Sequence, residues 1–180
     1  MADGQIHVVQ YNNRMGGAST ALNGASDPTK NQFYPSYSDD DKWIAFTRVD
    51  STTDTNLPGG IGNPLDQVFL VPAGGGTATR LAANDPASCA NMTSPGLTNS
   101  WPKWAPNSTT VGGSTYYWLT FSSKRNDVAT TGNPAQLYVT PIVVDGQGNI
   151  TTYPALYLWN QPGTDGNHTP AWVNFTIPIS

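Results

Sequence analysis

The stretch that decides the fold is YPSYSDDDKWIAFTR, residues 34–48. Its two tyrosines, Tyr34 and Tyr37, suit a pleated strand, and the acidic run at residues 39–41 suits a turn that stays in water. The apolar run at residues 43–46 is short enough to be a strand that is covered on both faces. The stretch therefore predicts two strands joined by a charged turn.

The same pattern recurs further along the chain. It returns as WPKWAPN at residues 101–107 followed by YYWLTFSS at residues 116–123, and it begins again as TPAW at residues 169–172. The prolines of the three copies, Pro35, Pro102 and Pro170, lie 67 and 68 residues apart, and Tyr or Trp follows each proline two positions later. A fixed period of this length predicts a repeat architecture.

Each unit has a second half that reads as another hairpin. The sequence QVFLVP at residues 67–72 precedes a glycine turn and a return strand at residues 77–81, and QLYVTP at residues 136–141 precedes a turn at residues 145–148 and a return strand at residues 149–153. An earlier copy begins with QIHVVQ at residues 5–10. Four strands joined as hairpins are the content of one propeller blade. The predicted fold is therefore all-β, with antiparallel four-stranded blades that form an incomplete propeller.

The repeat divides the chain into four parts. We expect a part-blade at residues 1–32, a blade at 33–83, a blade at 99–160 and the start of the next blade at 161–180. Long loops are expected at residues 50–66, 107–115 and 127–135, and a linker at residues 84–98 carries Cys89. Loops on a repeat scaffold commonly carry binding surfaces. A single cysteine forms no disulfide within the chain, so Cys89 is either inert or paired with a cysteine elsewhere.

The residues of the repeat resemble a known family. The stretch PSYSDDDKWIAF at residues 35–46 resembles the Pro-Asp turn and strand of the TolB-like β-propeller repeat, and FSSKRN at residues 121–126 followed by QLYV at 136–139 resembles its later turn and strand. Asp41 stands where that repeat usually has glycine, and Asn107 and Ser108 replace its Asp-Gly. The resemblance implies a six-bladed propeller, usually periplasmic or extracellular, that binds proteins or forms the accessory domain of a peptidase.

Composition and charge exclude several classes of function. The net charge of −4 argues against non-specific binding to nucleic acid, which needs a basic surface. No apolar run approaches the length of a membrane span, and residues 1–4 lack the features of a signal peptide. Only 11% of the residues are charged, which is typical of exported proteins. We therefore expect a protein of the cell envelope or the extracellular space, mature or cut from a longer precursor.

The sequence predicts no catalysis and no cofactor. It contains no Gly-x-Ser-x-Gly motif, and its two histidines, His7 and His168, are far apart in the repeat. The carboxylates of Asp39, Asp40 and Asp41 are weak candidates for calcium, because adjacent residues of one turn rarely face the same ion. The alternative is a turn whose carboxylates are simply solvated.

Two groups of residues are candidates for binding a partner. Phe33, Trp101 and His168 lie just before the repeat prolines, and they either ring one face of the propeller or belong to the core between blades. Lys124 and Arg125 are a basic pair in a predicted turn, where they are either solvated or in contact with an acidic partner.

The blade count predicts open edges. Two blades and two part-blades do not close a ring, and a propeller closes to remove its open edges. The chain is therefore the end of a longer protein, or copies associate head to tail into a ring or filament, or the chain is an open stack of sheets. For the head-to-tail case the expected contact residues are Ile6, Val8, Trp172, Phe175 and Ile177. The expected function is a non-catalytic scaffold that binds protein or assembles by blade completion; the alternatives are a peptidase's accessory propeller and a carbohydrate-binding propeller.

Overall fold

A computed structural model describes residues 4–50, 63–85, 98–125 and 134–173 of the chain. Within these residues the fold is all-β, apart from the single 3-10 turn η1 (Ala82–Asn84). The strands are β1 (His7–Val9), β2 (Ser19–Ala21), β3 (Asn31–Tyr37), β4 (Trp43–Val49), β5 (Gln67–Pro72), β6 (Thr79–Arg80), β7 (Ser100–Trp104), β8 (Thr109–Val111), β9 (Ser114–Ser123), β10 (Gln136–Val144), β11 (Ile150–Thr152) and β12 (Leu156–Tyr157).

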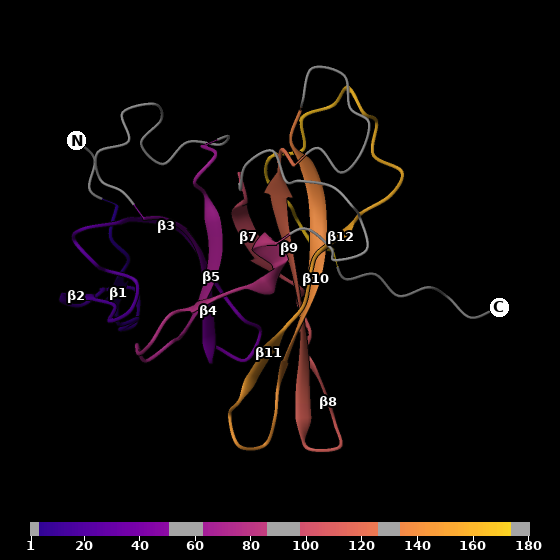
Figure 1. Cartoon of the computed structure of the whole chain (residues 1–180). Coiled ribbons are helices and arrows are strands. Elements are labelled where there is room, and N and C mark those ends of the chain that lie inside the picture. Colours follow the sequence, from indigo (N-terminus) through magenta and orange to yellow (C-terminus); the bar gives the residue numbers. More distant parts are fainter. Residues whose placement is uncertain (1–3, 51–62, 86–97, 126–133, 174–180) are drawn as a thin grey trace.

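The strands form three antiparallel sheets that follow one another in chain order (Figure 1). The N-terminal hairpin pairs β1 with β2, and sheet 1 has the order β3-β4-β5-β6. Sheet 2 contains β7, β9 and β10, with β12 and β11 paired to β10 and β8 paired to β9. The prediction of antiparallel four-stranded blades in an incomplete propeller is confirmed: sheet 1 is one such unit, and β7-β9-β10-β12 is the other.

Sheet 2 extends beyond the four-stranded unit. Strands β9 and β10 are longer than β4 and β5, and their far ends pair with β8 and β11, which project together at the bottom of Figure 1. The prediction of a loop at residues 107–115 is therefore wrong. Gly112 and Gly113 have φ angles of 59° and 81°, and two positive φ angles in a two-residue connection form the tight hairpin turn that allows β8 to pair.

The two four-stranded sheets share one irregularity at the same place. The register of β3 on β4 shifts between Phe33 and Ser36, and the register of β7 on β9 shifts between Ser100 and Lys103. Each shift places one extra residue on the first strand, which is a β-bulge. The residues inside these bulges include Tyr34 and Trp101, whose φ angles are 55° and 57°. A shared bulge with a left-handed aromatic residue shows that the two sheets are copies of one structural unit.

The N-terminal hairpin matches the second half of this unit. The amide N–H groups of Leu22, Leu81 and Leu158 donate to the carbonyl oxygens of Ile6, Val68 and Leu137 at 2.9, 3.2 and 3.1 Å, respectively. Each bond occupies the same position relative to its hairpin. The N-terminal hairpin is therefore the counterpart of β5–β6 and of β10–β12, and the described residues contain no counterpart of β3 and β4 beside it.

The core lies in two layers, one on each face of sheet 1. The first layer packs sheet 1 against the N-terminal hairpin, through Ile6, Leu22, Ala25, Ile44, Phe46, Phe69 and Val71. The second layer packs sheet 1 against sheet 2, through Ala45, Val68, Leu70, Leu81, Trp104, Tyr117, Leu119, Phe121, Tyr138 and Ile142. Because sheet 1 is covered on both faces, its strands β4 and β5 are almost continuously buried.

Candidate protein-interaction surface

One face of sheet 2 is exposed and apolar, and we call it the open flank. It carries the half-exposed aromatic residues Tyr116 and Trp118, the exposed Leu156, and the half-buried Leu137 and Val139. Strand pairing matches Trp118, Leu137 and Val139 of this flank with Trp43, Val68 and Leu70 of sheet 1. In sheet 1 those three residues pack against sheet 2. The open flank is therefore the face on which a following sheet would pack.

The chain after sheet 2 begins to cover this flank. The indole Nε1 of Trp172 donates to the carbonyl of Lys103 at 3.2 Å and to the hydroxyl of Thr120 at 3.0 Å. The indole Nε1 of Trp104 makes the matching bond one unit earlier, to the carbonyl of Ser36 at 2.8 Å. Trp172 thus lies against sheet 2 as Trp104 lies against sheet 1. Trp172 itself is 40% exposed, and Tyr116, Trp118 and Leu156 of the flank are exposed as well, so the flank stays largely open.

The acidic turn between β3 and β4 joins the two sheets. Asp39 accepts hydrogen bonds from the amide and the hydroxyl of Ser108, at 2.7 and 2.9 Å. Asp40 accepts from the Tyr117 hydroxyl at 2.8 Å and pairs with the Lys42 ammonium group at 3.0 Å. The carboxylates of Asp39 and Asp40 are thus engaged by residues of sheet 2 and its loops. Asp39 remains exposed, as the prediction of a solvated turn requires, whereas Asp40 is half-buried and the prediction is wrong for it.

The contacts of Asp40 shift two pKa values. Burial would raise the pKa of Asp40, but the hydrogen bonds from Ser38, Tyr117 and Lys42 outweigh it and lower that pKa to about 2. Burial, together with the hydrogen bond to the Asp40 carboxylate and its charge, raises the pKa of the Tyr117 hydroxyl. The carboxylate is therefore ionised at all ordinary pH values. Among the described residues no group of three or more His, Cys, Asp or Glu side chains is placed to hold a metal ion.

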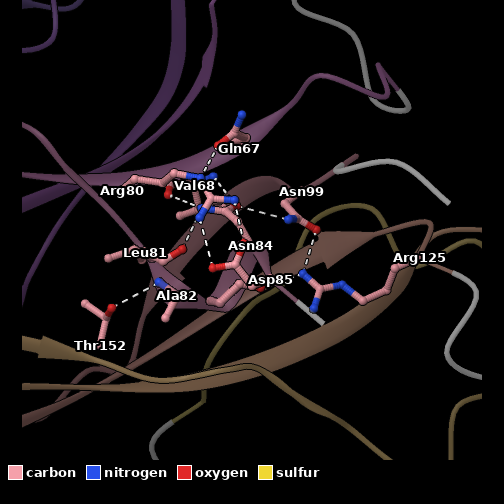
Figure 2. Close-up of polar contacts among 11 residues, drawn as sticks. Gln67, Val68, Arg80, Leu81, Ala82, Asn84, Asp85, Asn99, Arg125 and Thr152 are labelled. Carbon is pink, nitrogen blue, oxygen red and sulfur yellow. Dashed lines mark hydrogen bonds and ion pairs between the residues drawn. The ribbon is translucent and has the colours of Figure 1, made fainter. Parts of the chain in front are cut away.

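A buried set of polar side chains closes the same interface at its other end (Figure 2). We call Asn84, Asn99 and Arg125 the first amide cluster. Asn84 accepts from the Val68 amide at 2.8 Å and from the Asn99 side chain at 3.0 Å, and it donates to the carbonyl of Val68 at 2.8 Å. The cluster ties η1 of the first unit to the chain that enters sheet 2.

Arg125 completes the first amide cluster from the second unit. Its Nη2 donates to the carbonyl of Ala83 at 2.6 Å and to Asn99 Oδ1 at 2.9 Å, and its guanidinium lies 4.8 Å from the centre of the Tyr138 ring. The side chain is only 5% exposed. The prediction that Arg125 lies in a solvated turn or meets a partner is therefore wrong, because carbonyl and aromatic groups of the core bind its charge. Its neighbour Lys124 is half-buried.

A second, incomplete version of this cluster lies in the following unit. We call Gln161 and Asn167 the second amide cluster. Gln161 accepts from the Leu137 amide at 2.8 Å and from the Asn167 side chain at 3.1 Å, and it donates to the Leu137 carbonyl at 2.9 Å. The main chain agrees as well, since the amides of Asn99 and Asn167 donate to the carbonyls of Asp66 and Ala135. Sequence reasoning missed both clusters, although Asn99 and Asn167 each stand three residues before a repeat proline.

The three candidates before the repeat prolines have different surroundings. Trp101 stacks on Tyr34, with ring centres 4.0 Å apart and an angle of 19° between the planes, and Phe33 meets Tyr34 edge to face. The structural counterpart of Trp101 is therefore Tyr34, one residue away from the predicted alignment with Phe33. His168 is half-buried, and its Nδ1 atom has no hydrogen-bond partner among the described residues.

The residues predicted to mediate assembly lie in different parts of the structure. Ile6 is 5% exposed and Val8 packs beside it on sheet 1, so both belong to the core layer under the N-terminal hairpin. The prediction that Ile6 contacts another chain is wrong, because sheet 1 of the same chain covers it. Trp172 lies on the open flank, as described above. Phe175, Ile177 and Cys89 lie outside the described residues.

Comparison of the chain with protein-family models, curated proteins and solved structures finds no match. None of the helices in the described part of the chain is long and apolar enough to cross a membrane. The description of the fold and of the repeat therefore rests on the strands, bulges and hydrogen bonds of this chain and not on a related protein.

Proposed function

We propose that the protein is a non-catalytic scaffold that binds protein through the open flank of sheet 2. The observation that carries the proposal is the match between the two sheets: residues that are fully buried in sheet 1, such as Leu70, have half-buried apolar counterparts in sheet 2, such as Val139. Apolar side chains in a contiguous exposed patch mark interaction surfaces. An exported location and membership of the TolB-like family belong to the same proposal, and the repeat residues support them.

Copies of the chain are one source of the bound protein. Strand β1 pairs only with β2 among the described residues, so its other edge is open to a further strand. The open flank and the open edge lie at opposite ends of the row of sheets (Figure 1). This arrangement favours a head-to-tail contact, which closes into a ring or continues as a filament.

The test is the native mass of the particle at micromolar concentration, measured by light scattering. We expect a mass of two or more chains, and we expect Trp118→Ser to lower it toward one chain. The control is Leu65→Ser, because Leu65 is 45% exposed and precedes β5 of sheet 1, away from both ends of the row of sheets. A strictly monomeric chain would exclude assembly from copies and leave binding of a different protein.

Binding of carbohydrate is the second candidate. It is favoured by the exposure of Trp159, at 84%, close in sequence to strand β12 of sheet 2. Aromatic faces on a propeller stack on sugar rings. Titration with neutral oligosaccharides tests this function, and we expect them to quench tryptophan fluorescence. Trp159→Ala should abolish that quenching. Quenching that is as strong in Trp159→Ala as in the unaltered chain would exclude a sugar site at Trp159.

A further inference from the structure

The second amide cluster lacks the arginine that completes the first. In the first cluster, the Arg125 guanidinium fills two acceptors, the Ala83 carbonyl and Asn99 Oδ1. The matching acceptors one unit later are the Asn160 carbonyl and Asn167 Oδ1, because Gln161 and Asn167 repeat the bonds of Asn84 and Asn99. No donor in the described part of the chain reaches either acceptor.

The interface between the N-terminal hairpin and sheet 1 provides a contrast. There the Ile6 amide donates to the backbone carbonyl of Ala25 at 3.0 Å, so a backbone carbonyl takes the place of the Asn84 side chain. Strand pairing matches Arg125 of sheet 2 with Asp50 of sheet 1, and Asp50 pairs with Arg48. Gln32 stands at the position of Asn99, where it is buried and its side chain donates to the Asp27 carbonyl at 3.2 Å. This interface therefore lacks the bonded pair of side-chain amides, and it has Asp50 where sheet 2 has the arginine. The bonded pair of side-chain amides therefore occurs together with the arginine, and the second cluster keeps that pair.

We propose that the open flank of sheet 2 receives a four-stranded sheet of the same repeat, whose second strand is followed by an arginine that binds between Asn160 and Asn167. The inference rests on the proposed function, and it names the partner's chemistry. Two further observations support a sheet of this repeat as the occupant. Trp172 already makes the contact that Trp104 makes, and the apolar positions of the flank match those that sheet 2 covers on sheet 1.

The inference distinguishes this occupant from a second copy's N-terminal hairpin. That hairpin has no counterpart of β4 or β9, the strands after which Asp50 and Arg125 stand. A head-to-tail copy would therefore cover the apolar part of the flank and leave the second amide cluster unfilled. A complete sheet, from a longer form of the chain or from another protein of this repeat, would fill both.

The experiment duplicates residues 99–166 inside the full chain, so that the inserted copy follows Gly166 and residues 167–180 still end the protein. The inserted Asn99 then takes the place of Asn167, and the inserted Arg125 faces the first-copy Gln161 and Asn160. Stacking is measured by acrylamide quenching of the first-copy Trp118, as the difference from its Trp118→Phe variant. We expect at least a twofold loss of quenching relative to the unduplicated chain.

The arginine is then tested in the inserted copy alone. We expect Arg125→Met there to lower the folding equilibrium constant about tenfold in urea, because bonds to a charged donor are lost. Lys124→Met in the same copy is the matched control, with the same charge change and little effect expected. If Trp118 is protected but both variants behave alike, the arginine inference is wrong and the flank still binds a sheet. If Trp118 stays fully quenched, the duplicated sheet does not dock, and the inference is overturned together with this form of the proposed function.

Discussion

Sheet 1 and sheet 2 have the same strand order, the same bulge and the same leucine hydrogen bond, yet they are covered differently. Sheet 1 lies between two neighbours, and Leu81 in it is fully buried. Sheet 2 has a neighbour on one face, and the matching residue, Leu158, is only half-buried. One residue pattern therefore forms core or surface, depending on whether another sheet packs against it.

The largest effect is expected from the matched pair of leucines. Leu81→Ala should lower the free energy of unfolding by about 3–4 kcal/mol, because it leaves a cavity between two sheets. Leu158→Ala should cost about 1 kcal/mol, since part of its side chain already meets water. Urea denaturation of both variants measures the difference. Equal losses would mean that the open flank is covered in solution, and dilution would then show whether copies cover it.

The second prediction concerns the first amide cluster. Arg125→Met should destabilise the chain by about 2–3 kcal/mol, because Asn99 Oδ1 and the Ala83 carbonyl lose a charged donor inside the fold. Gln161→Met in the incomplete second cluster should cost about half as much, since Gln161 is half-buried. Thermal unfolding followed by circular dichroism measures both. A larger loss for Gln161→Met would reverse the expected order of the two clusters.

The third prediction is a pH dependence. The pKa of Asp40 falls from its ordinary value of 3.8 to about 2 on folding. A depressed pKa adds stability that is present above about pH 4 and is lost as the pH falls toward 2. Between pH 4 and pH 2 the unaltered protein should therefore lose on the order of 1–2 kcal/mol of its free energy of unfolding through this group. Asp40→Asn should not show this part of the loss. Urea midpoints at pH 2, 3, 4 and 6 test it, and parallel profiles would show that the contact with Tyr117 carries no such stability.

The smallest effect on stability is expected for Trp118. Trp118→Ser should change the free energy of unfolding of the isolated chain by within about 0.5 kcal/mol, because the residue is half-exposed. Trp43→Ser, the matched variant in sheet 1, should cost about 1–2 kcal/mol because Trp43 packs against the core between the sheets. Guanidinium titrations at low protein concentration compare them. A loss for Trp118→Ser as large as for Trp43→Ser would contradict the open flank.

Much of the fold could be predicted from sequence because strands and turns are local. The hairpin at residues 34–48, the repeat prolines and the glycine turns each carry their signal within a few residues. The loop predicted at residues 107–115 failed because its pairing depends on the extra length of β9. Hairpin signals from Gly112 and Gly113 were present, but an apolar run was missing.

The candidate surface was harder to predict than the strands. Arg125 is next to Lys124 in sequence and belongs to the core, because the acceptors that bind it lie 26 and 42 residues earlier in the chain. The carboxylates of Asp39 and Asp40 likewise find partners 69 and 77 residues away. Such contacts follow from the packing of one unit on the next, which no short window of sequence contains.

The stacked rings of Tyr34 and Trp101 make the two ends of the row of units different. Both residues sit in bulges with left-handed backbone, a conformation that costs side chains about 1–2 kcal/mol. At the third repeat position the chain has Thr169, whose side chain has no ring to extend the column. The column of aromatic rings therefore terminates after two members. Neighbouring units are consequently not interchangeable. The residue before each repeat proline determines which unit can stack on which, and so fixes the order of the units along the row.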